Sequence, residues 1–490
     1  QNNIVQQIAE SYMSHYPDNF SIIDQTENVD LTHALNSAFS ECRGEYIGIV
    51  HANDTLELDA LECLAAQCQN DVDRPDILYT DHDELVQTSQ IHTPHLKPSW
   101  SPELLLETDY IKHFFVITHS LFDSIEGLHP EANNVELYDL LLRATEKADS
   151  IIHIPRILYH QNTNTVKDTE ILPDIQHAVE RSLERKGVSE NVSVEISSVM
   201  QQAHPFVSLN FMKSNNPLVS IIIPTKNNSD LLSTCLHGIQ QRTDYENYEV
   251  IVVDNGSTTK EAVSHLANIS EKVIRIETGK FNFSTLNNRA AEHAKGELFL
   301  LLNDDTEPLD SEWLRQLVGV MSLDPRIGVV GPKLVYPHSI NGKEVQHAGM
   351  VLGRHTASLV QFKYRKDLGY ANYNQVMRNC SAVSGAALLT RKDIFTELDG
   401  LNEKDLAVDY SDVDYCLRVQ ELGFRTVFTP HSVLVHHESA TRGNNNGKGA
   451  TLNNVETLYM QERWKELIEH DPYYHPAFTR NPHEFAFTIV

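Results

Sequence analysis

The sequence lacks the features of several protein classes. No segment stays apolar for the roughly 18 residues that a membrane-spanning helix requires. The six cysteines form no paired CxxC pattern and are sparse for 490 residues, which argues against a zinc ribbon or a disulfide framework and favours a reducing cytoplasm. The chain begins with neither a methionine nor a signal-peptide apolar region, so we expect its natural amino terminus to lie upstream.

Positive charge is also scarce. The formal net charge is −29 at pH 7, because 68 aspartates and glutamates outnumber 39 lysines and arginines. A surface of this sign repels phosphate backbones, so we expect no nucleic-acid partner and no anchor built on a polybasic stripe. The hydrophobic content of 41% is that of a folded globular protein, and the length predicts two domains of about 200 residues each.

A regular pattern of strands and helices begins near residue 217. Two short, β-branched apolar runs, 219–223 and 249–253, flank a helical pattern, which is the signature of a βαβ unit in a parallel sheet. These runs and a later one, 298–302, lead into polar residues that read PTKN, DNG and NDD. Ligands bind beyond the carboxyl ends of such strands, so we expect the three polar groups to meet at one crevice. No G-x-G-x-x-G turn follows the first run, which excludes a nicotinamide-dependent enzyme.

The first half of the chain repeats part of this pattern. Residues 35–54 parallel 286–306, and residues 138–143 parallel 413–418, whereas nothing before residue 30 supplies the two opening apolar runs. We therefore predict an α/β protein with two Rossmann-like domains and mostly parallel central sheets, the first domain being incomplete at its amino terminus. The predicted segments are a truncated domain at 1–162, a connector of helix and strand at 163–216, a complete domain at 217–445 and a helical tail at 446–490.

Three clusters in the second half carry groups suited to catalysis. Asp304 and Asp305 end a buried strand, where adjacent carboxylates favour a hard divalent cation, although they also suit a turn before the next helix. Asp412 falls in the first turn of a predicted helix, where it suits either general-base catalysis or ordinary capping. His436 follows an apolar run and can complete a carboxylate-bound metal site, and Arg442 behind it can hold a diphosphate oxygen.

Five strings in order make the second half recognisable: VSIIIPTKNN, YEVIVVDNGST, NFSTLNNRAAEHAKGELFLLLNDDTEP, VSGAALLTRKDIF and DYSDVDYCLRVQELGFRTVFTPHSVLVHHESATRG. Together they resemble family 2 glycosyltransferases of the GT-A type, in particular the bacterial rhamnosyltransferase-like members of surface-polysaccharide clusters. The first half resembles the additional transferase-like domain that such proteins often carry at the amino terminus.

The resemblance implies a role for each matching residue. Asp304 would approach the ribose and the donor sugar, Asp305 and His436 would bind the metal, and Asp412 would be the catalytic base. Gly385 would line the junction of donor and acceptor. The residues matched to binding of the nucleotide base and ribose are Pro224, Thr225, Asp254 and Asn288.

The resemblance also implies a reaction, which is a metal-dependent, inverting transfer of a hexosyl or deoxyhexosyl unit. The donor would be a UDP- or dTDP-sugar, the ion Mn²⁺ or Mg²⁺, and the acceptor a hydroxyl of a lipid-linked glycan or oligosaccharide. The product would be O-antigen, capsule or cell-wall glycan. Such a protein would lie in the cytoplasm or peripherally on the cytoplasmic face of the inner membrane, with other polysaccharide-assembly enzymes as partners.

Several residues depart from the family pattern. Asn303 stands where the first carboxylate of the DXD motif is expected, and Ser411 replaces the acid that precedes the base. These departures leave a second function open, a non-catalytic carbohydrate- or partner-binding scaffold built from decayed transferase domains. The first half departs further, with Leu137 in place of the base and Ala-Asn at 52–53 in place of the two aspartates. This predicts an inactive domain, unless Asp54 restores the metal site.

Overall fold

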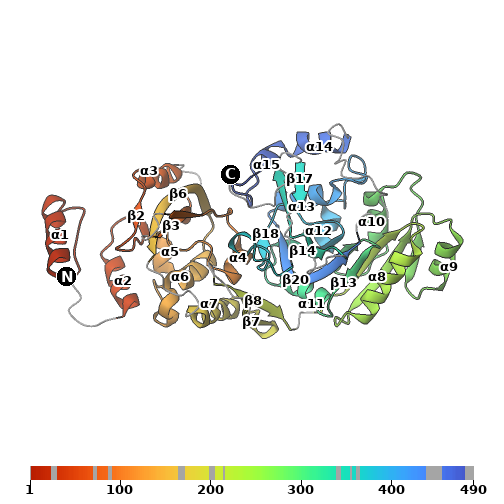
Figure 1. The fold of residues 1–490 in the computed structure, drawn as a ribbon, viewed down its shortest axis with the longest axis horizontal. Helices are drawn as coiled ribbons and strands as arrows, with labels where there is room; N and C mark the ends of the chain where they lie inside the picture. Colours follow the sequence, from red (N-terminus) through yellow and green to blue (C-terminus); the bar gives the residue numbers. More distant parts are fainter. Residues whose placement is uncertain are drawn as a thin grey trace.

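The structure is a computed structural model in which two α/β regions lie side by side along the long axis, the first half of the chain at one end and the second half at the other (Figure 1). Within the described residues, no helix is both long and apolar enough to cross a membrane. The described residues are 2–23, 30–69, 74–86, 91–163, 171–197, 205–212, 216–337, 344–353, 356–359, 365–437 and 455–479.

A ten-stranded sheet forms the centre of the second half. Its strands are β9 (Val219–Thr225), β10 (Tyr248–Asp254), β11 (Lys272–Arg275), β12 (Leu298–Leu302), β13 (Thr306–Pro308), β14 (Ile327–Val335), β15 (Val345–His347), β18 (Arg378–Asn379), β19 (Ala387–Arg391) and β20 (Arg425–His436). The strand order is β11-β10-β9-β12-β19-β14-β20-β13, with β15 beside β14 and β18 beside β20. β11, β10, β9 and β12 run parallel, and every residue of β9 and β12 is buried, as expected for strands covered on both faces.

Helices connect these strands and continue beyond the sheet. They are α8 (Ser229–Gln241), α9 (Lys260–Asn268), α10 (Phe283–Ala291), α11 (Trp313–Ser322), α12 (Lys392–Glu397), α13 (Ser411–Glu421), α14 (Val455–Arg463) and α15 (Lys465–Glu469). A hairpin of β16 (Met350–Gly353) and β17 (Thr356–Leu359) and the short turn η4 (Tyr370–Asn372) lie between β15 and β18. α10 begins where the Asn282 side chain accepts a hydrogen bond from the amide of Thr285 (2.8 Å), which satisfies one of the free amides of the first turn.

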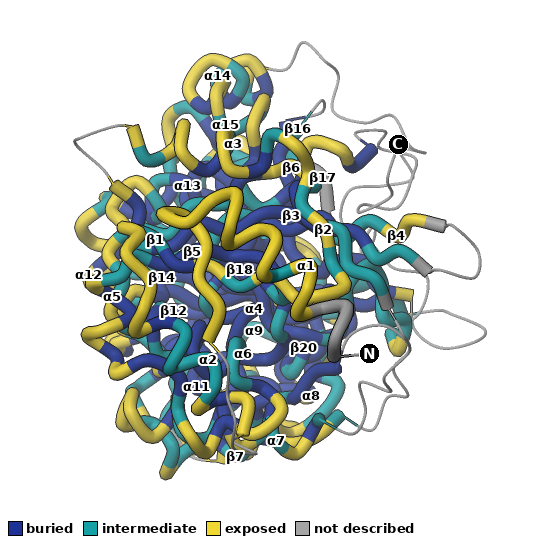
Figure 2. Tube along the Cα trace, turned by 90° about the vertical axis from the view of Figure 1, so that its left-hand side faces the viewer, coloured by how far each residue is buried: buried dark blue, intermediate teal, exposed yellow. Residues whose placement is uncertain are grey.

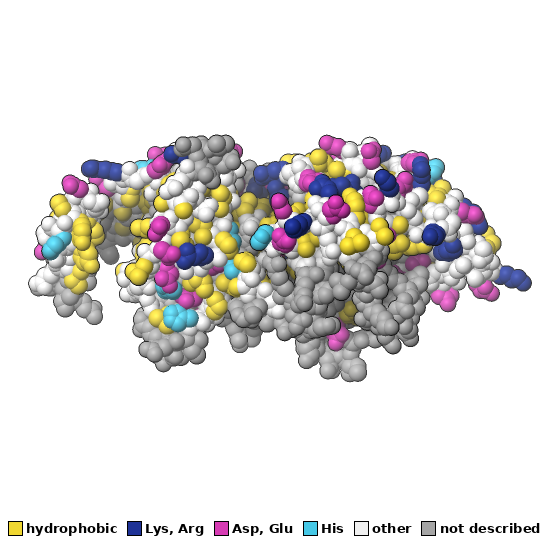
Figure 3. Space-filling model, turned by 90° about the horizontal axis from the view of Figure 1, so that it is seen from above, with side chains coloured by type: hydrophobic (Ala, Val, Ile, Leu, Met, Phe, Trp, Pro, Cys, Tyr) yellow, Lys and Arg dark blue, Asp and Glu magenta, His cyan; other side chains and the backbone are white. Residues whose placement is uncertain are grey.

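The first half is built on a six-stranded sheet in the order β1-β5-β3-β6-β2, with β4 beside β3. The strands are β1 (Tyr46–Gly48), β2 (Thr55–Leu56), β3 (Ile77–Val86), β4 (Ile91–His95), β5 (Phe115–Thr118) and β6 (Ile151–Thr163). The helices are α1 (Asn2–His15), α2 (Leu31–Ser40), α3 (Ala60–Cys68), α4 (Pro102–Glu107), α5 (His119–Ser124), η1 (Pro130–Val135), α6 (Glu136–Thr145) and α7 (Leu172–Arg185). α1 lies apart at the end of the molecule, where Figure 3 shows apolar side chains gathered on the surface.

The two sheets share one topology. β1, β5, β3, β6 and β2 follow one another in the same directions as β12, β19, β14, β20 and β13, namely antiparallel, antiparallel, parallel and antiparallel. Among the described residues, the first half has no counterpart of β9, β10 and β11. The predicted α/β fold, with two related domains and an incomplete first copy, is therefore confirmed.

The strand directions are more mixed than we predicted. In the described part of the first sheet, β3 and β6 form the single parallel pair. The reason is that the run of parallel neighbours in the second sheet lies in β11, β10, β9 and β12, and three of these are the strands without a counterpart in the first copy. The prediction assumed that the parallel pairing of the first βαβ unit continues through both sheets. The strands after β12 instead pair in mixed directions.

Side-chain contacts repeat along with the strands. On α6, Arg143 pairs with Asp139 at 2.8 Å, and on α13, Arg418 pairs with Asp414 at 2.7 Å. Each arginine also donates to the carbonyl of the C-cap residue of the corresponding earlier helix, α5 or α12. Both aspartates are buried, so removal of the arginine would leave an unpaired buried charge on the same helix in each copy.

A connector and a direct interface join the two halves. After α7, β7 (Val192–Ile196) and β8 (Val207–Phe211) form a hairpin, and the Phe211 ring packs on α11 at Gly319, where a Cβ would lie 2.2 Å from the ring. From α4, the buried Glu107 pairs with His431 at 2.6 Å and accepts a hydrogen bond from the Met377 amide at 2.6 Å. Buried residues of both halves belong to one hydrophobic core. Figure 2, a view along the long axis, shows the buried residues in dark blue at the centre of the molecule.

The segment that follows α15 contacts both halves. His475 Nε2 lies 2.8 Å from Asp81 on β3, in the first half. Asp471 accepts hydrogen bonds from the Ser381 hydroxyl (2.8 Å) and the Leu352 amide (2.6 Å), both in the second half. This C-terminal segment therefore bridges the two halves.

Candidate active site

The carboxyl ends of β9, β10 and β12 bring polar residues to one edge of the sheet. Asp254 lies opposite Thr225 in the register of β10 and β9, and β12 adjoins β9 on its other side. Thr225 Oγ1 donates a hydrogen bond of 2.6 Å to Asp304 Oδ2, and Pro224 precedes Thr225 as a buried residue of β9. The strand ends therefore meet, as the sequence predicted.

Asp304 and Asp305 are both almost fully buried at this edge, with exposed fractions of 7% and 6%. The pKa of Asp304 is raised to about 6, first by burial and also by the charge of Asp305, while hydrogen bonds from Thr225 and Asn228 oppose the rise. Two adjacent buried carboxylates are costly unless a positive charge lies beside them. The pair therefore suits a divalent cation.

His436 completes a group of potential metal ligands. Thr306 on β13 lies opposite His436 on β20, which places His436 Nε2 3.2 Å from Asp305 Oδ1. That oxygen is buried and makes no hydrogen bond with the described residues. The other ring nitrogen, Nδ1, contacts Gln346 Oε1 at 2.8 Å, which fixes the orientation of the imidazole. Sequence reasoning missed Gln346, because it lies at an irregular point of the β14–β15 pairing and has no periodic signal.

The other residues predicted to bind the nucleotide differ in their surroundings. Asp254 is buried, accepts a hydrogen bond from the Ser257 amide (2.8 Å) and pairs with the half-exposed Arg275 (3.0 Å). Asn288 instead uses both ends of its side-chain amide on the backbone of Leu401, donating to the carbonyl (2.8 Å) and accepting from the amide (2.8 Å). The structure thus gives Asn288 a packing role that the sequence did not indicate.

A cavity of about 610 Å³ lies beside Asp254. Arg275, the partner of Asp254, contributes to its wall, together with Lys280, Arg289 and Lys404. Three glutamates, Glu277, Glu292 and Glu403, also line it, so the wall carries charges of both signs. The cavity is large enough for a small organic ligand.

Asp412 stands at the start of α13, as predicted. Its Oδ2 accepts a hydrogen bond from the Gly385 amide (2.7 Å) and its Oδ1 one from the Val413 amide (2.9 Å), and such donors stabilise the ionised carboxylate. The approach is close, since a Cβ on Gly385 would lie 3.2 Å from Asp412 Cβ. Tyr410, just before α13, has a left-handed backbone (φ 61°), which is unusual for a bulky residue.

The loop that holds Asp412 is adjacent to the aspartate pair. β12 and β19 are neighbours with Leu302 opposite Ala387, and the Asn303 amide donates to the Ala386 carbonyl at 3.0 Å. The loop 384–386 therefore connects the two groups of carboxylates directly.

A buried histidine positions this loop. His347 Nε2 accepts a hydrogen bond from the Ser384 amide (3.1 Å), and its Nδ1 contacts the Pro332 carbonyl (3.2 Å). Burial lowers the pKa of His347 to about 3, so the ring is neutral and can donate from one nitrogen and accept at the other. His347 was not among the predicted site residues.

The helix α14 supports the segment that precedes α13. The carboxylate of Glu456 on α14 accepts hydrogen bonds from three consecutive amides, those of Ala407, Val408 and Asp409. Arg442, which we predicted to hold a diphosphate oxygen, lies outside the described residues.

The first half has a different set of groups at the corresponding positions. Thr55 on β2 lies opposite His160 on β6, just as Thr306 lies opposite His436, so Asp54 takes the place of Asp305. The sequence repeat had matched Asn53 to that position, because the connection between β1 and β2 differs in length from its counterpart. The Tyr159 hydroxyl and the backbone amide of Asn162 (2.9 Å) both donate hydrogen bonds to the Asp54 carboxylate.

Comparison with known proteins adds a family and named relatives. Residues 2–123 and 220–399 match the family described as glycosyl transferase family 2. An uncharacterised protein, y4gI, from Sinorhizobium fredii is 33% identical over 95% of this chain and 52% of its own length. The O-antigen biosynthesis protein RfbC of Myxococcus xanthus is 31% identical over 94% of this chain and 36% of its own.

A third relative, the O-antigen chain rhamnosyltransferase RfbN of Salmonella typhimurium, is 26% identical over 46% of this chain and 67% of its own length. The chain thus spans about half or less of the length of the first two relatives.

Proposed function

Because the chain belongs to glycosyl transferase family 2, we propose that its second half transfers a sugar from a nucleoside-diphosphate sugar to a hydroxyl of a glycan acceptor, with inversion. The observation that carries the proposal is the cluster of Thr225, Asp304, Asp305 and His436 at the carboxyl ends of neighbouring strands, with the Asp412 loop bonded to it. This arrangement provides a place for an anionic donor beside a carboxylate base.

Asp305 and His436 would hold a divalent cation, Mn²⁺ or Mg²⁺. Their donor atoms fit such an ion, since Asp305 Oδ1 is buried, faces His436 Nε2 and makes no hydrogen bond with the described residues. When bound, the ion would neutralise charge on the departing diphosphate. Gln346 would keep the imidazole turned toward the site.

Asp412 would act as the base of a single displacement. It would take the proton of the acceptor hydroxyl, whose oxygen then attacks the anomeric carbon on the face opposite the departing nucleoside diphosphate, which inverts the configuration. Two backbone amides stabilise the charged carboxylate, and His347 keeps the loop with the Gly385 amide in place.

Donor and acceptor are proposed by chemistry and by analogy with the relatives. Thr225, Asp254 and the cavity beside Arg275 offer polar groups and room for a nucleotide. By resemblance to the family we favour a UDP- or dTDP-sugar that donates a hexosyl or deoxyhexosyl unit. The O-antigen relatives favour a growing surface polysaccharide as acceptor. Contact with the cytoplasmic face of a membrane and with other assembly enzymes stays a prediction.

The test is a hydrolysis and transfer screen of UDP-, dTDP- and GDP-sugars with Mn²⁺ or Mg²⁺. We expect metal-dependent release of one nucleoside diphosphate by the parent and its loss in Asp305→Ala. Asp54→Ala, at the corresponding position of the first copy, is the matched control and should leave the rate unchanged.

Two results would contradict the proposal. One is equal release by the parent and Asp305→Ala. The other is binding of nucleotides in calorimetry with no donor consumed, even when glycan acceptors are supplied, which would favour the non-catalytic scaffold.

A further inference from the structure

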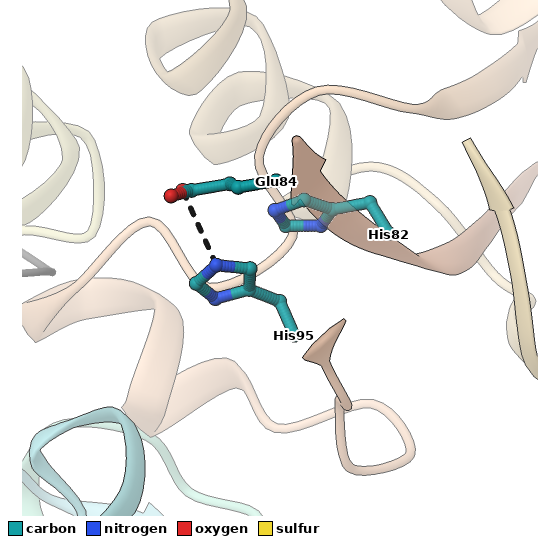
Figure 4. A group of neighbouring side chains, drawn as sticks. All are labelled: His82, Glu84 and His95. Carbon is teal, nitrogen blue, oxygen red and sulfur yellow. Dashed lines mark ion pairs between the residues drawn. The ribbon is translucent and has the colours of Figure 1, made fainter. Parts of the chain in front are cut away.

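The β3–β4 hairpin of the first half carries two clusters of histidine and carboxylate side chains. Successive residues of a strand point to opposite faces of the sheet, so residues 82 and 84 share one face and residue 83 the other. Within each cluster the potential ligand atoms lie within 4.8 Å of one another. The first cluster consists of His82, Glu84 and His95 (Figure 4), and the second of Asp83, His92 and His160.

His82 is the unusual member of the first cluster. It is fully buried, and neither ring nitrogen has a hydrogen-bond partner among the described residues. Its ring stacks on that of His95 at 4.6 Å between centroids, and His95 Nε2 lies 3.2 Å from Glu84 Oε1. Figure 4 shows a nitrogen of each ring on the side of the Glu84 carboxylate. A buried imidazole with two unsatisfied nitrogens is costly, so its environment calls for a bound ion or water.

Groups of both signs lie around His82. Glu84 supplies the carboxylate of the cluster, and the positive charges of Lys97 and Lys112 reach His82 from nearby. The Lys97 ammonium is engaged, since it donates to the carbonyls of Thr80 and Ile111.

A small cavity adjoins the cluster at the seam between the halves. Its volume is about 20 Å³, which is room for one water-sized particle. His82 and His95 line it from the first half, and Tyr370 and Tyr373 line it from the second.

We propose that His82, Glu84 and His95 bind one divalent ion of the Zn²⁺ type, in a site separate from the proposed transferase centre. Two imidazoles and one carboxylate form a donor set typical of Zn²⁺, and the cavity leaves a fourth position for water. The ion fixes β4 directly before Leu96, whose amide and carbonyl contact the Tyr370 hydroxyl at 2.6 and 3.2 Å. Its role is to hold the two halves together at this seam.

The second cluster serves as an internal control, because its groups already satisfy one another. Asp83 contacts Nδ1 of His160 at 2.7 Å and Nδ1 of His92 at 2.8 Å. The remaining nitrogen of His160 lies 3.1 Å from Glu57 Oε1. The hairpin thus offers one cluster that contains an unsatisfied imidazole, that of His82, and one cluster whose groups bond to each other.

The test titrates Zn²⁺ and Co²⁺ into the full chain carrying Asp305→Ala, which removes the other proposed metal ligand. We expect one equivalent to bind, with the visible absorption bands of low-coordinate Co²⁺. Glu84→Gln and His95→Ala should each weaken binding by more than about tenfold. His92→Ala should bind like the parent, and circular dichroism checks that each variant is folded. Glu84→Gln is the safest variant, because the Glu84 side chain is 26% exposed.

The proposal is overturned if the parent binds neither ion at micromolar concentration. It is also overturned if His92→Ala abolishes binding while Glu84→Gln retains it, since the ion would then occupy the second cluster. Both readouts measure metal binding alone, so they are independent of transferase activity.

Discussion

Asn36 in the first half and Asn288 in the second make the same two hydrogen bonds, to the amide and the carbonyl of Leu128 and of Leu401. By contrast, Asp305, just before β13, and His436 on β20 face one another in the second half. Their counterparts in the first half, Asp54 and His160, bond to other groups. We interpret contacts that recur in both copies as structural, and contacts present in one copy as related to the chemistry of that copy. Comparing the two copies of the fold within this chain therefore distinguishes structural residues from candidate functional residues.

The largest effect is expected at Asp412, a position that the first copy fills with Leu137. Asp412→Asn keeps the shape of the side chain but removes the base, so turnover should fall by about 10²–10⁴-fold. Donor binding, measured by calorimetry, should change little. An equal loss of turnover and of donor affinity would reject Asp412 as the base.

The interface between the copies provides the next largest effect. Glu107 is fully buried and accepts from the amides of Leu209 and Met377 as well as pairing with His431, so Glu107→Ala leaves several buried groups unpaired. We expect a loss of about 3–5 kcal/mol in the free energy of unfolding, measured in urea. The control is Glu421→Ala, which breaks a half-exposed pair with Arg463 and should cost less than about 1 kcal/mol. If the two variants lowered the free energy of unfolding equally, the interface between the halves would not depend on Glu107.

The recurring asparagine can be tested in both copies at once. Asn36→Ala and Asn288→Ala should each lower the free energy of unfolding by about 1–3 kcal/mol, because each leaves an amide and a carbonyl without a partner. The donor KM of Asn288→Ala should stay near that of the parent. A raised KM with unchanged stability would instead restore the nucleotide-binding role that the sequence suggested for Asn288.

The smallest effect concerns pH, and only the second copy should show it. The pKa of Asp304 is raised to about 6, above its ordinary value of 3.8, so between these values the folded state binds more protons than the unfolded state. Its contribution to stability is therefore present below about pH 4 and is lost as pH rises through 6. Asp304→Asn should flatten this part of the stability profile measured by urea unfolding. A profile identical to that of the parent would show that Asp304 does not titrate there.

Much of the fold and of the candidate active site could be predicted from the sequence, for physical reasons. The apolar runs of β9, β10 and β12, with a helical pattern between the first two, are typical of covered parallel strands, and the polar residues after such strands meet at one edge. The antiparallel insertion of β19 between β12 and β14 is not visible in any local pattern. Gln346 and His347 were missed for a related reason, since β15 is short and irregular and their partners are distant in sequence.

The contact between His475 and Asp81 joins residues 394 positions apart. During synthesis on the ribosome, this contact can therefore form only after almost the whole remaining chain has been made. Long-range closure of this kind slows folding and leaves partly assembled surfaces exposed in the meantime. We expect nascent chains that stop short of residue 471 to be the species that chaperones and proteases recognise, even though both sheets have already been synthesised.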